Sequence, residues 1–139
     1  MTRRYLLDTN HLSAAINRVS PLRDRLRLAH RAGLVLGTCI PVVCELEAGI
    51  QQTDDPEGCR RALGNLLGFV RVWPLEFALA QRYGEVFFEV RSRGRALSQV
   101  DMMLVAFTRQ MNLTLLTSDG DFKALPDIRT ENWLTVLAS

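Results

Sequence analysis

The sequence has no long apolar segment and few of the residues that build metal–thiolate sites. No apolar run approaches the roughly 20 residues that a membrane-spanning helix needs, so a membrane partner is not expected. The three cysteines form no C-x-x-C pair, no H-E-x-x-H pattern is present, and the two histidines lie far apart in the sequence. These spacings argue against a zinc site. The cysteines are expected to be reduced and mostly buried.

Lysine is almost absent as well. Lys123 is the only one, so nearly all of the 17 basic residues are arginine. The planar guanidinium group of arginine suits phosphate, but a net charge of +2 is too small to establish a nucleic-acid partner. A signal peptide is not expected either, because the N-terminus leads directly into a strand pattern, and we expect a cytoplasmic protein.

Repeats, low-complexity tracts and linkers are missing, so residues 1–139 are expected to form a single domain. Strand-like apolar runs alternate with patterns of helical period. The expected strands cover about 5–7, 34–37, 70–74, 113–117 and 133–137. The expected helices cover about 10–17, 21–32, 40 to beyond 49, 56–68, 76–93 and 102–111. Thr9 or Asn10 is expected to cap the first and Asp55 the fourth, and Gly33 is expected to end the second. The helix at 76–93 carries an apolar pattern of three- and four-residue spacing that includes Phe77 and Phe87. The alternation of strands and helices predicts an α/β fold with a parallel sheet that helices cover on both faces.

Several acidic residues fall where such a fold binds ligands, at the carboxyl ends of the strands. Asp8 directly follows the first strand, and Asp119 directly follows the fourth. Glu45 lies in the second turn of the helix that leaves the second strand, so it belongs to the same edge. Asp101 lies near a helix start without an obvious preceding strand, and the pattern alone places it less securely.

Four carboxylates at one edge would repel one another and force protons onto some of them. A divalent cation relieves that repulsion, and ligands that are all oxygen favour Mg²⁺ or Mn²⁺ over zinc. Such a site can activate water and hold phosphate oxygens during an in-line displacement. The acids therefore point to hydrolysis of a phosphodiester.

Each acid also has a simpler structural explanation. Ser98 and Asp101 match a capping box, S-x-x-D, and Asp101 could have only that role. Asp8 and Asp119 could form turns at strand ends, and Glu45 could be a surface acid paired with an arginine. Taken one residue at a time, the sequence leaves these alternatives open.

Two other classes of phosphate chemistry fit less well. A phosphotransferase of the haloacid dehalogenase type needs a second acid two residues after the first, where this chain has Asn10. A receiver-type signalling domain needs a phosphoacceptor aspartate after the third strand, where this chain has Trp73-Pro74-Leu75.

Four short motifs follow one another along nearly the whole chain. They are Leu7-Asp8-Thr9-Asn10, Glu45-Leu46-Glu47-Ala48-Gly49, Asp101 to Ala106, and Leu116 to Phe122. In this order they resemble the L-D-T-[NS], E-L-x-x-G, D-x-x-[IL]-[AV]-A and L-[VL]-T-x-D-x-D-F motifs of the PIN-domain ribonucleases. Among these, the chain resembles the VapC-like toxins of bacterial toxin–antitoxin pairs. It departs from the family before E-L, where Ser or Thr is common and this chain has Cys44.

The resemblance implies a three-layer α/β/α sandwich with a parallel sheet in the order 3-2-1-4-5. It also implies a site for Mg²⁺ or Mn²⁺ whose catalytic ligands are Asp8, Glu45, Asp101 and Asp119. Thr9, Asn10 and Thr117 would orient the carboxylates or the substrate. Asp121 would be a ligand, an acid behind the ligands, or the N-cap of the turn at Phe122.

The activity that the resemblance implies is RNA hydrolysis that leaves a 5′-phosphate and a 3′-hydroxyl. Arg91, Arg93 and Arg95 would hold the RNA backbone, or else form a solvated helix end. The family usually forms homodimers and is inhibited by a small VapB-like antitoxin. The alternative is a catalytically silent PIN-like module that binds RNA or protein, which acids at all four positions argue against.

Overall fold

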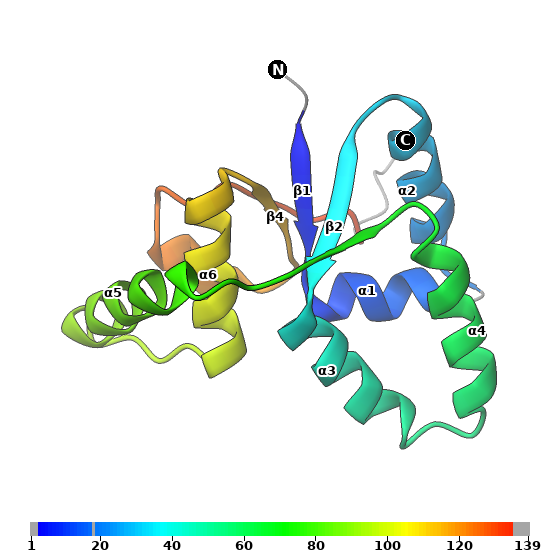
Figure 1. Ribbon diagram of the computed structural model, residues 1–139, viewed down its shortest axis with the longest axis horizontal. Helices are drawn as coiled ribbons and strands as arrows, with labels where there is room; N and C mark the ends of the chain where they lie inside the picture. The colour runs from blue at the N-terminus through cyan, green and yellow to red at the C-terminus, as the bar shows by residue number, and fades with distance from the viewer. Residues whose placement is uncertain (1–2, 18, 135–139) are drawn as a thin grey trace.

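The computed structural model describes residues 3–17 and 19–134, which form one parallel sheet with helices on both sides (Figure 1). The strand order is β3-β2-β1-β4-β5, and every neighbouring pair is parallel. The strands are β1 Arg4–Leu7, β2 Val35–Cys39, β3 Arg71–Trp73, β4 Thr114–Leu116 and β5 Thr130–Glu131. The predicted strand order is confirmed.

The helices form the two outer layers. They are α1 Thr9–Ile16, α2 Leu22–Arg31, α3 Ile40–Ile50, α4 Pro56–Leu66, α5 Ala78–Ser92 and α6 Gln99–Met111, with a 3₁₀ helix η1 at Gly120–Ala124. Helices α5 and α6 lie on one side of the sheet, and α1, α2 and α4 lie on the other (Figure 1). The predicted three-layer α/β/α arrangement is therefore confirmed. Within the described ranges, no helix combines the length and apolarity that a membrane span demands.

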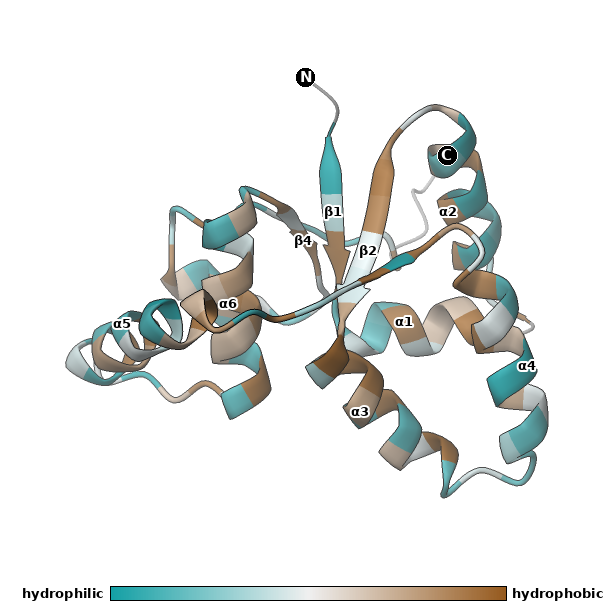
Figure 2. Ribbon diagram, in the orientation of Figure 1, coloured by the Kyte–Doolittle hydropathy of each residue, from teal (hydrophilic) through white to brown (hydrophobic). Residues whose placement is uncertain are grey.

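The central strands form the core of the molecule. Leu6 and Leu7 of β1 and Leu115 and Leu116 of β4 are completely buried. Apolar residues concentrate on these strands and on the helix faces that cover them (Figure 2). A strand buried on both faces needs a continuous apolar run, which explains why β1 and β4 lack alternation. Because Leu7 pairs with Leu116, the residues after them leave the sheet at the same edge.

Local chemistry determines several helix ends as predicted. The Asp55 carboxylate accepts a hydrogen bond from the Gly58 backbone N–H at the start of α4, and the Ser98 hydroxyl accepts one from the Asp101 N–H at the start of α6. Helix α2 ends before Gly33, whose φ of +91° places it in the left-handed region.

Some predicted details are wrong. The first helix is capped by Asp8, not by Thr9 or Asn10, because Asp8 is still extended and its carboxylate accepts from the third residue of α1. The last strand is Thr130–Glu131, not 133–137. Residues 133 and 134 are outside any strand, and residues 135–137 lie beyond the described part of the chain.

The burial of two residue types also differs from the prediction. Cys39 is buried and all three cysteines are free, but Cys44 is exposed and Cys59 is half-buried. In α5 the apolar period does mark a buried face, yet Phe77 and Phe87 belong to the same pattern and are exposed. The period shows which residues share a face but not how far a neighbouring helix covers it.

Candidate active site

Asp8 begins the site, at the point where β1 gives way to α1. It is 6% exposed, and its Oδ1 accepts a hydrogen bond of 2.9 Å from the backbone N–H of His11. The same oxygen lies 3.1 Å from Nδ1 of the His11 ring. Asp8 is therefore both the N-cap of α1 and a carboxylate at the carboxyl edge of the sheet.

Glu45 reaches the same edge from α3. Its Oε1 accepts a hydrogen bond of 2.6 Å from the Thr9 hydroxyl. On α3, the residue that forms an ion pair with an arginine is Glu47, whose carboxylate lies 3.2 Å from Arg60. Glu45 is thus positioned by a hydroxyl from α1. It is exposed, as a surface acid would be, but within residues 3–17 and 19–134 no ion pair joins it to an arginine.

Asp101 lies in the first turn of α6, and its backbone N–H donates to the Ser98 hydroxyl, which is the Ser98 half of the predicted capping box. Burial is the main reason that the pKa of Asp101 is raised above its ordinary value, while a hydrogen bond with the Ser98 side chain lowers it. The other contributions are upward, from the negative charges of Asp119, Glu45 and Asp8. The four carboxylates are thus close enough to raise the cost of ionising Asp101.

Asp119 follows β4 and is hydrogen-bonded to two residues close to it in the sequence. Its N–H donates to the Thr117 hydroxyl at 3.0 Å, and its Oδ1 accepts from the Asp121 N–H at 2.9 Å. Asp119, not Asp121, is therefore the N-cap of η1. Thr117 is buried, and its hydroxyl accepts the hydrogen bond that holds the start of this turn.

One cavity of about 390 Å³ collects these acids. Its lining comes from four separate segments of the chain and consists of Asp8, Thr9, Asn10, Glu45, Ser98, Asp101, Leu104 and Asp119. In residues 3–17 and 19–134, no three or more His, Cys, Asp or Glu side chains are grouped closely enough to hold a metal ion in their present positions. The structure thus shows an acidic cavity whose carboxylates are held by separate hydrogen bonds.

The PIN domain family model matches residues 5–128 of the chain. The chain belongs to the PIN domain family. The ribonuclease VapC2 of Haemophilus influenzae is 26% identical to it over 132 residues, which cover 94% of this chain and 98% of that protein. The ribonuclease VapC2 of Rickettsia felis is also 26% identical, over 131 residues, with 93% and 97% covered. The resemblance to VapC-like proteins is confirmed.

Solved structures agree on the fold. A chain in the crystal structure of VapBC2 from Rickettsia felis, bound to a DNA fragment from their promoter, superposes with a TM-score of 0.84 at 24% identity. It covers 94% of this chain and 98% of its own. DNA-bound VapBC from Salmonella typhimurium gives a TM-score of 0.80 at 21% identity, with 96% and 99% covered.

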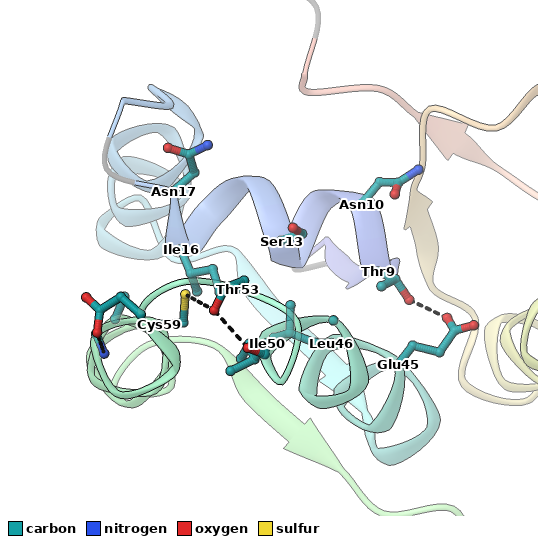
Figure 3. Close-up of a pocket in the computed structure, with 14 residues that line it drawn as sticks. Thr9, Asn10, Ser13, Ile16, Asn17, Glu45, Leu46, Ile50, Thr53 and Cys59 are labelled. Atoms are coloured by element: carbon teal, nitrogen blue, oxygen red, sulfur yellow. Dashed lines mark hydrogen bonds between the residues drawn. The ribbon is translucent and has the colours of Figure 1, made fainter.

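A second hollow of about 540 Å³, drawn in Figure 3, shares part of its lining with the acidic cavity of this PIN domain. It runs between α1, α3 and α4, and it shares Thr9, Asn10 and Glu45 with the acidic cavity. The hydrogen bond between Thr9 and Glu45 lies at one end of it, while Thr53 and Cys59 lie toward the other (Figure 3).

The three arginines predicted to contact RNA do not line the acidic cavity. Arg93 donates to the Ala124 carbonyl at 2.8 Å and pairs with Glu89 at 3.2 Å, and the Arg91 guanidinium lies over the Phe87 ring. Arg93 and Arg95 instead line a separate cavity of about 240 Å³, which also contains Asp121. Their contact with RNA stays a prediction.

His11 is the site residue that sequence reasoning missed. Its side chain is completely buried behind Asp8, and its Nε2 accepts a hydrogen bond of 3.1 Å from the Trp133 backbone N–H. The sequence contains one usable signal, since His11 stands three residues after the aspartate that caps its helix. Ser98 and Leu104 also line the cavity; Ser98 was predicted only as a cap.

Proposed function

We propose that this PIN domain is a ribonuclease that depends on Mg²⁺ or Mn²⁺ and serves as the toxin of a toxin–antitoxin pair. The observation that carries the proposal is the cavity into which separate elements bring Asp8, Glu45, Asp101 and Asp119. The ribonuclease names of the two VapC2 relatives support the same reaction class. The products would carry a 5′-phosphate and a 3′-hydroxyl.

The chemistry of the cavity fits a hard divalent cation. Its charged donors are all carboxylate oxygens, with no His or Cys side chain in the lining. Burial raises the pKa of Asp101 most, and the negative charges of its neighbours raise it further, a repulsion that a bound cation would offset. When bound, the cation supplies an activated water and positive charge for the phosphate oxygens. The proposed ligands are Asp8, Glu45, Asp101 and Asp119.

The remaining polar residues have positioning roles in the proposed reaction. Thr9 orients Glu45 through its hydroxyl, and Thr117 shapes the loop of Asp119. Asn10 lines the cavity with an exposed amide, which can hydrogen bond to a phosphate or ribose oxygen of the RNA. Asp121 acts through its backbone N–H, which holds one oxygen of Asp119.

The RNA backbone would approach past the cationic end of α5. Arg91, Arg93 and Arg95 are all exposed, and Arg95 and Asp121 both line the cavity next to η1. Arginine binds phosphate through a planar pair of donors, which suits contact with a backbone of any sequence. These residues are proposed to hold RNA, and Arg93 would keep its bonds to Glu89 and Ala124.

The proposed partners are a VapB-like antitoxin and a second copy of the chain, in the cytoplasm. Several of the similar solved structures are VapBC complexes, which supports an antitoxin of that class. Support for a homodimer comes from α5, where Phe88 is 74% exposed, and from Phe77 just before it, which is 95% exposed. Exposed aromatic side chains such as these two are enriched at protein interfaces.

The decisive experiment replaces Asp8 by Asn. Asn caps a helix about as well as Asp, so α1 and the fold should persist while the negative charge is lost. Purified Asp8→Asn protein should fail to cleave RNA in Mn²⁺, and the wild type should lose cleavage in chelator. Asp24→Asn on α2, where the side chain is 79% exposed, is the matched control and should cleave normally.

Cleavage that survives in the Asp8→Asn protein, or that persists in chelator, would contradict the metal-dependent mechanism. A folded wild-type protein that binds RNA without cutting it in either metal would instead favour the catalytically silent module.

A further inference from the structure

The two oxygens of the Asp8 carboxylate have different surroundings. Oδ1 accepts from the backbone N–H of His11 at 2.9 Å and lies 3.1 Å from the His11 ring nitrogen Nδ1. Within residues 3–17 and 19–134, no hydrogen bond to Oδ2 is found. One oxygen is therefore fixed by two contacts to a single residue, and the other is left for the acidic cavity, which Asp8 lines.

The far side of the His11 ring determines which proton it carries. Nε2 accepts a hydrogen bond of 3.1 Å from the Trp133 backbone N–H, so this nitrogen must present a lone pair. In the neutral imidazole the proton then resides on Nδ1, which points at Asp8. The backbone of Trp133 thus makes His11 a donor toward the carboxylate.

Trp133 is itself held firmly. Its ring packs against Tyr5 of β1 at 5.0 Å between centroids, and the Arg25 guanidinium lies 4.5 Å from the ring centre. The indole N–H donates to Glu131 at 3.0 Å. Hydrogen bonds link Trp133 to His11 and His11 to Asp8. Contacts to the sheet and to α2 therefore fix Trp133, the member of this series that lies away from the cavity.

We propose that His11 is a positioning residue that orients Asp8 for cation binding, in the tautomer that the Trp133 backbone selects. The inference rests on the proposed metal-dependent function. A carboxylate whose rotation is restricted by a hydrogen bond loses less freedom when it binds a cation, and groups behind metal ligands commonly change metal affinity by about 10- to 100-fold. A purely structural buried histidine would affect folding stability but would leave cation affinity unchanged in the folded protein.

Two substitutions separate the two ring nitrogens. Asn at position 11 places its amide near the position of Nδ1, so His11→Asn keeps a donor for Asp8 and loses the bond from Trp133. Gln reaches the position of Nε2, so His11→Gln keeps an acceptor for Trp133 and loses the donor for Asp8. His11→Phe retains a ring and removes both bonds. The backbone N–H that also binds Asp8 is present in every variant.

The experiment measures Mn²⁺ affinity by titration calorimetry, without RNA, on proteins shown to be folded by circular dichroism. His11→Asn should bind Mn²⁺ within a few-fold of wild type. His11→Gln and His11→Phe should bind about 10- to 100-fold more weakly. His30→Phe is the control, because His30 packs against Phe69 and does not line the acidic cavity, and its Mn²⁺ affinity should equal that of the wild type.

A second measurement needs no metal. Histidine ¹⁵N chemical shifts of the metal-free protein should show the His11 proton on Nδ1, and a proton on Nε2 would overturn the proposal. Wild-type Mn²⁺ affinity in folded His11→Phe would overturn it while leaving the proposed function intact. Absence of Mn²⁺ binding by the wild type would instead overturn the metal-dependent function together with the inference that rests on it.

Discussion

The Thr9 hydroxyl and the Glu45 carboxylate are joined by a hydrogen bond of 2.6 Å between α1 and α3. Both residues line the acidic cavity and the neighbouring hollow, so both spaces include this bond. Figure 3 shows the bond at one end of the hollow. Glu45 is exposed, and a free glutamate would lose considerable side-chain entropy on binding a cation. In the proposed function the Thr9 hydroxyl would limit that loss, because it already holds the carboxylate at the cavity.

Replacing Thr9 by Val should therefore reduce cleavage while barely changing stability. The bond is exposed, and its net contribution to folding is expected to be about 1 kcal/mol or less. We expect kcat/KM for RNA cleavage to fall by about 10-fold, in the range found for groups that support metal ligands. Thr9→Ser retains the hydroxyl and is the control. A Thr9→Val protein with wild-type kcat/KM would show that Glu45 needs no support.

Replacing Asp101 by Asn should stabilise the metal-free protein. The raised pKa of Asp101 means that folding disfavours its ionised form, mainly through burial and also through the neighbouring acids. The contribution of Asp101 to the free energy of unfolding is therefore fully present below about pH 4, the ordinary pKa of aspartate. It is lost as the pH rises from there through the raised pKa of Asp101 in the folded protein. At pH 7 in chelator, Asp101→Asn should therefore melt at a higher temperature than wild type.

Adding Mn²⁺ provides the companion measurement. The wild-type melting temperature should rise with Mn²⁺, because a ligand that binds only the folded state stabilises it. Asp101→Asn should show a smaller rise and no RNA cleavage. A wild-type protein whose melting temperature does not change at saturating Mn²⁺ would count against a preformed cation site.

Much of the site could be predicted because its determinants are local in sequence. An aspartate directly after a buried strand must emerge at the carboxyl edge of the sheet, and this rule placed Asp8 and Asp119 correctly. The Ser98–Asp101 capping box needs only a spacing of three residues. The strand order followed from motif resemblance, since periodicity alone does not specify which strands are neighbours.

The parts that escaped prediction depend on distant contacts. His11 orients toward Asp8 through a bond to Trp133, which is 122 residues away in sequence. Asp8 was not predicted to cap α1, because Thr9 and Asn10 are also good capping residues and directly follow it in the sequence. The exposure of Phe77 depends on where neighbouring elements end, and the apolar period of α5 carries no information on that.

The three free cysteines should differ in reactivity toward a thiol reagent. Burial raises the pKa of the Cys39 thiol to about 11, so almost no thiolate forms at pH 8. Cys44 is exposed and should react first, followed by the half-buried Cys59. With Ellman's reagent at pH 8, the folded protein should release two equivalents of thionitrobenzoate, one for each accessible cysteine, and the unfolded protein should release three. Rapid release of a third equivalent before unfolding would show that Cys39 is accessible.

Arg109 of α6 should control how the protein responds to acid. It binds Glu89 of α5 at 2.7 Å and Asp127 at 2.8 Å, tying α5, α6 and the segment before β5 together. Its hydrogen bonds hold the pKa values of both carboxyls below their ordinary range. The stability from these pairs is therefore complete above the ordinary values of about 4, and it is lost as pH falls toward the lowered ones.

Replacing Arg109 by Met removes this stability while keeping a long apolar stem. Because Asp127 is largely exposed, the expected loss in the free energy of unfolding at pH 7 is only about 1 kcal/mol. The free energy of unfolding, measured with urea, should differ less between wild type and Arg109→Met below about pH 4.5, because Glu89 and Asp127 become protonated in the wild type. Arg82→Met, which breaks an exposed pair at 3.7 Å, should change stability little at any pH. An undiminished difference at pH 3 would show that Arg109 stabilises through packing, because apolar contact does not depend on the charge of its neighbours.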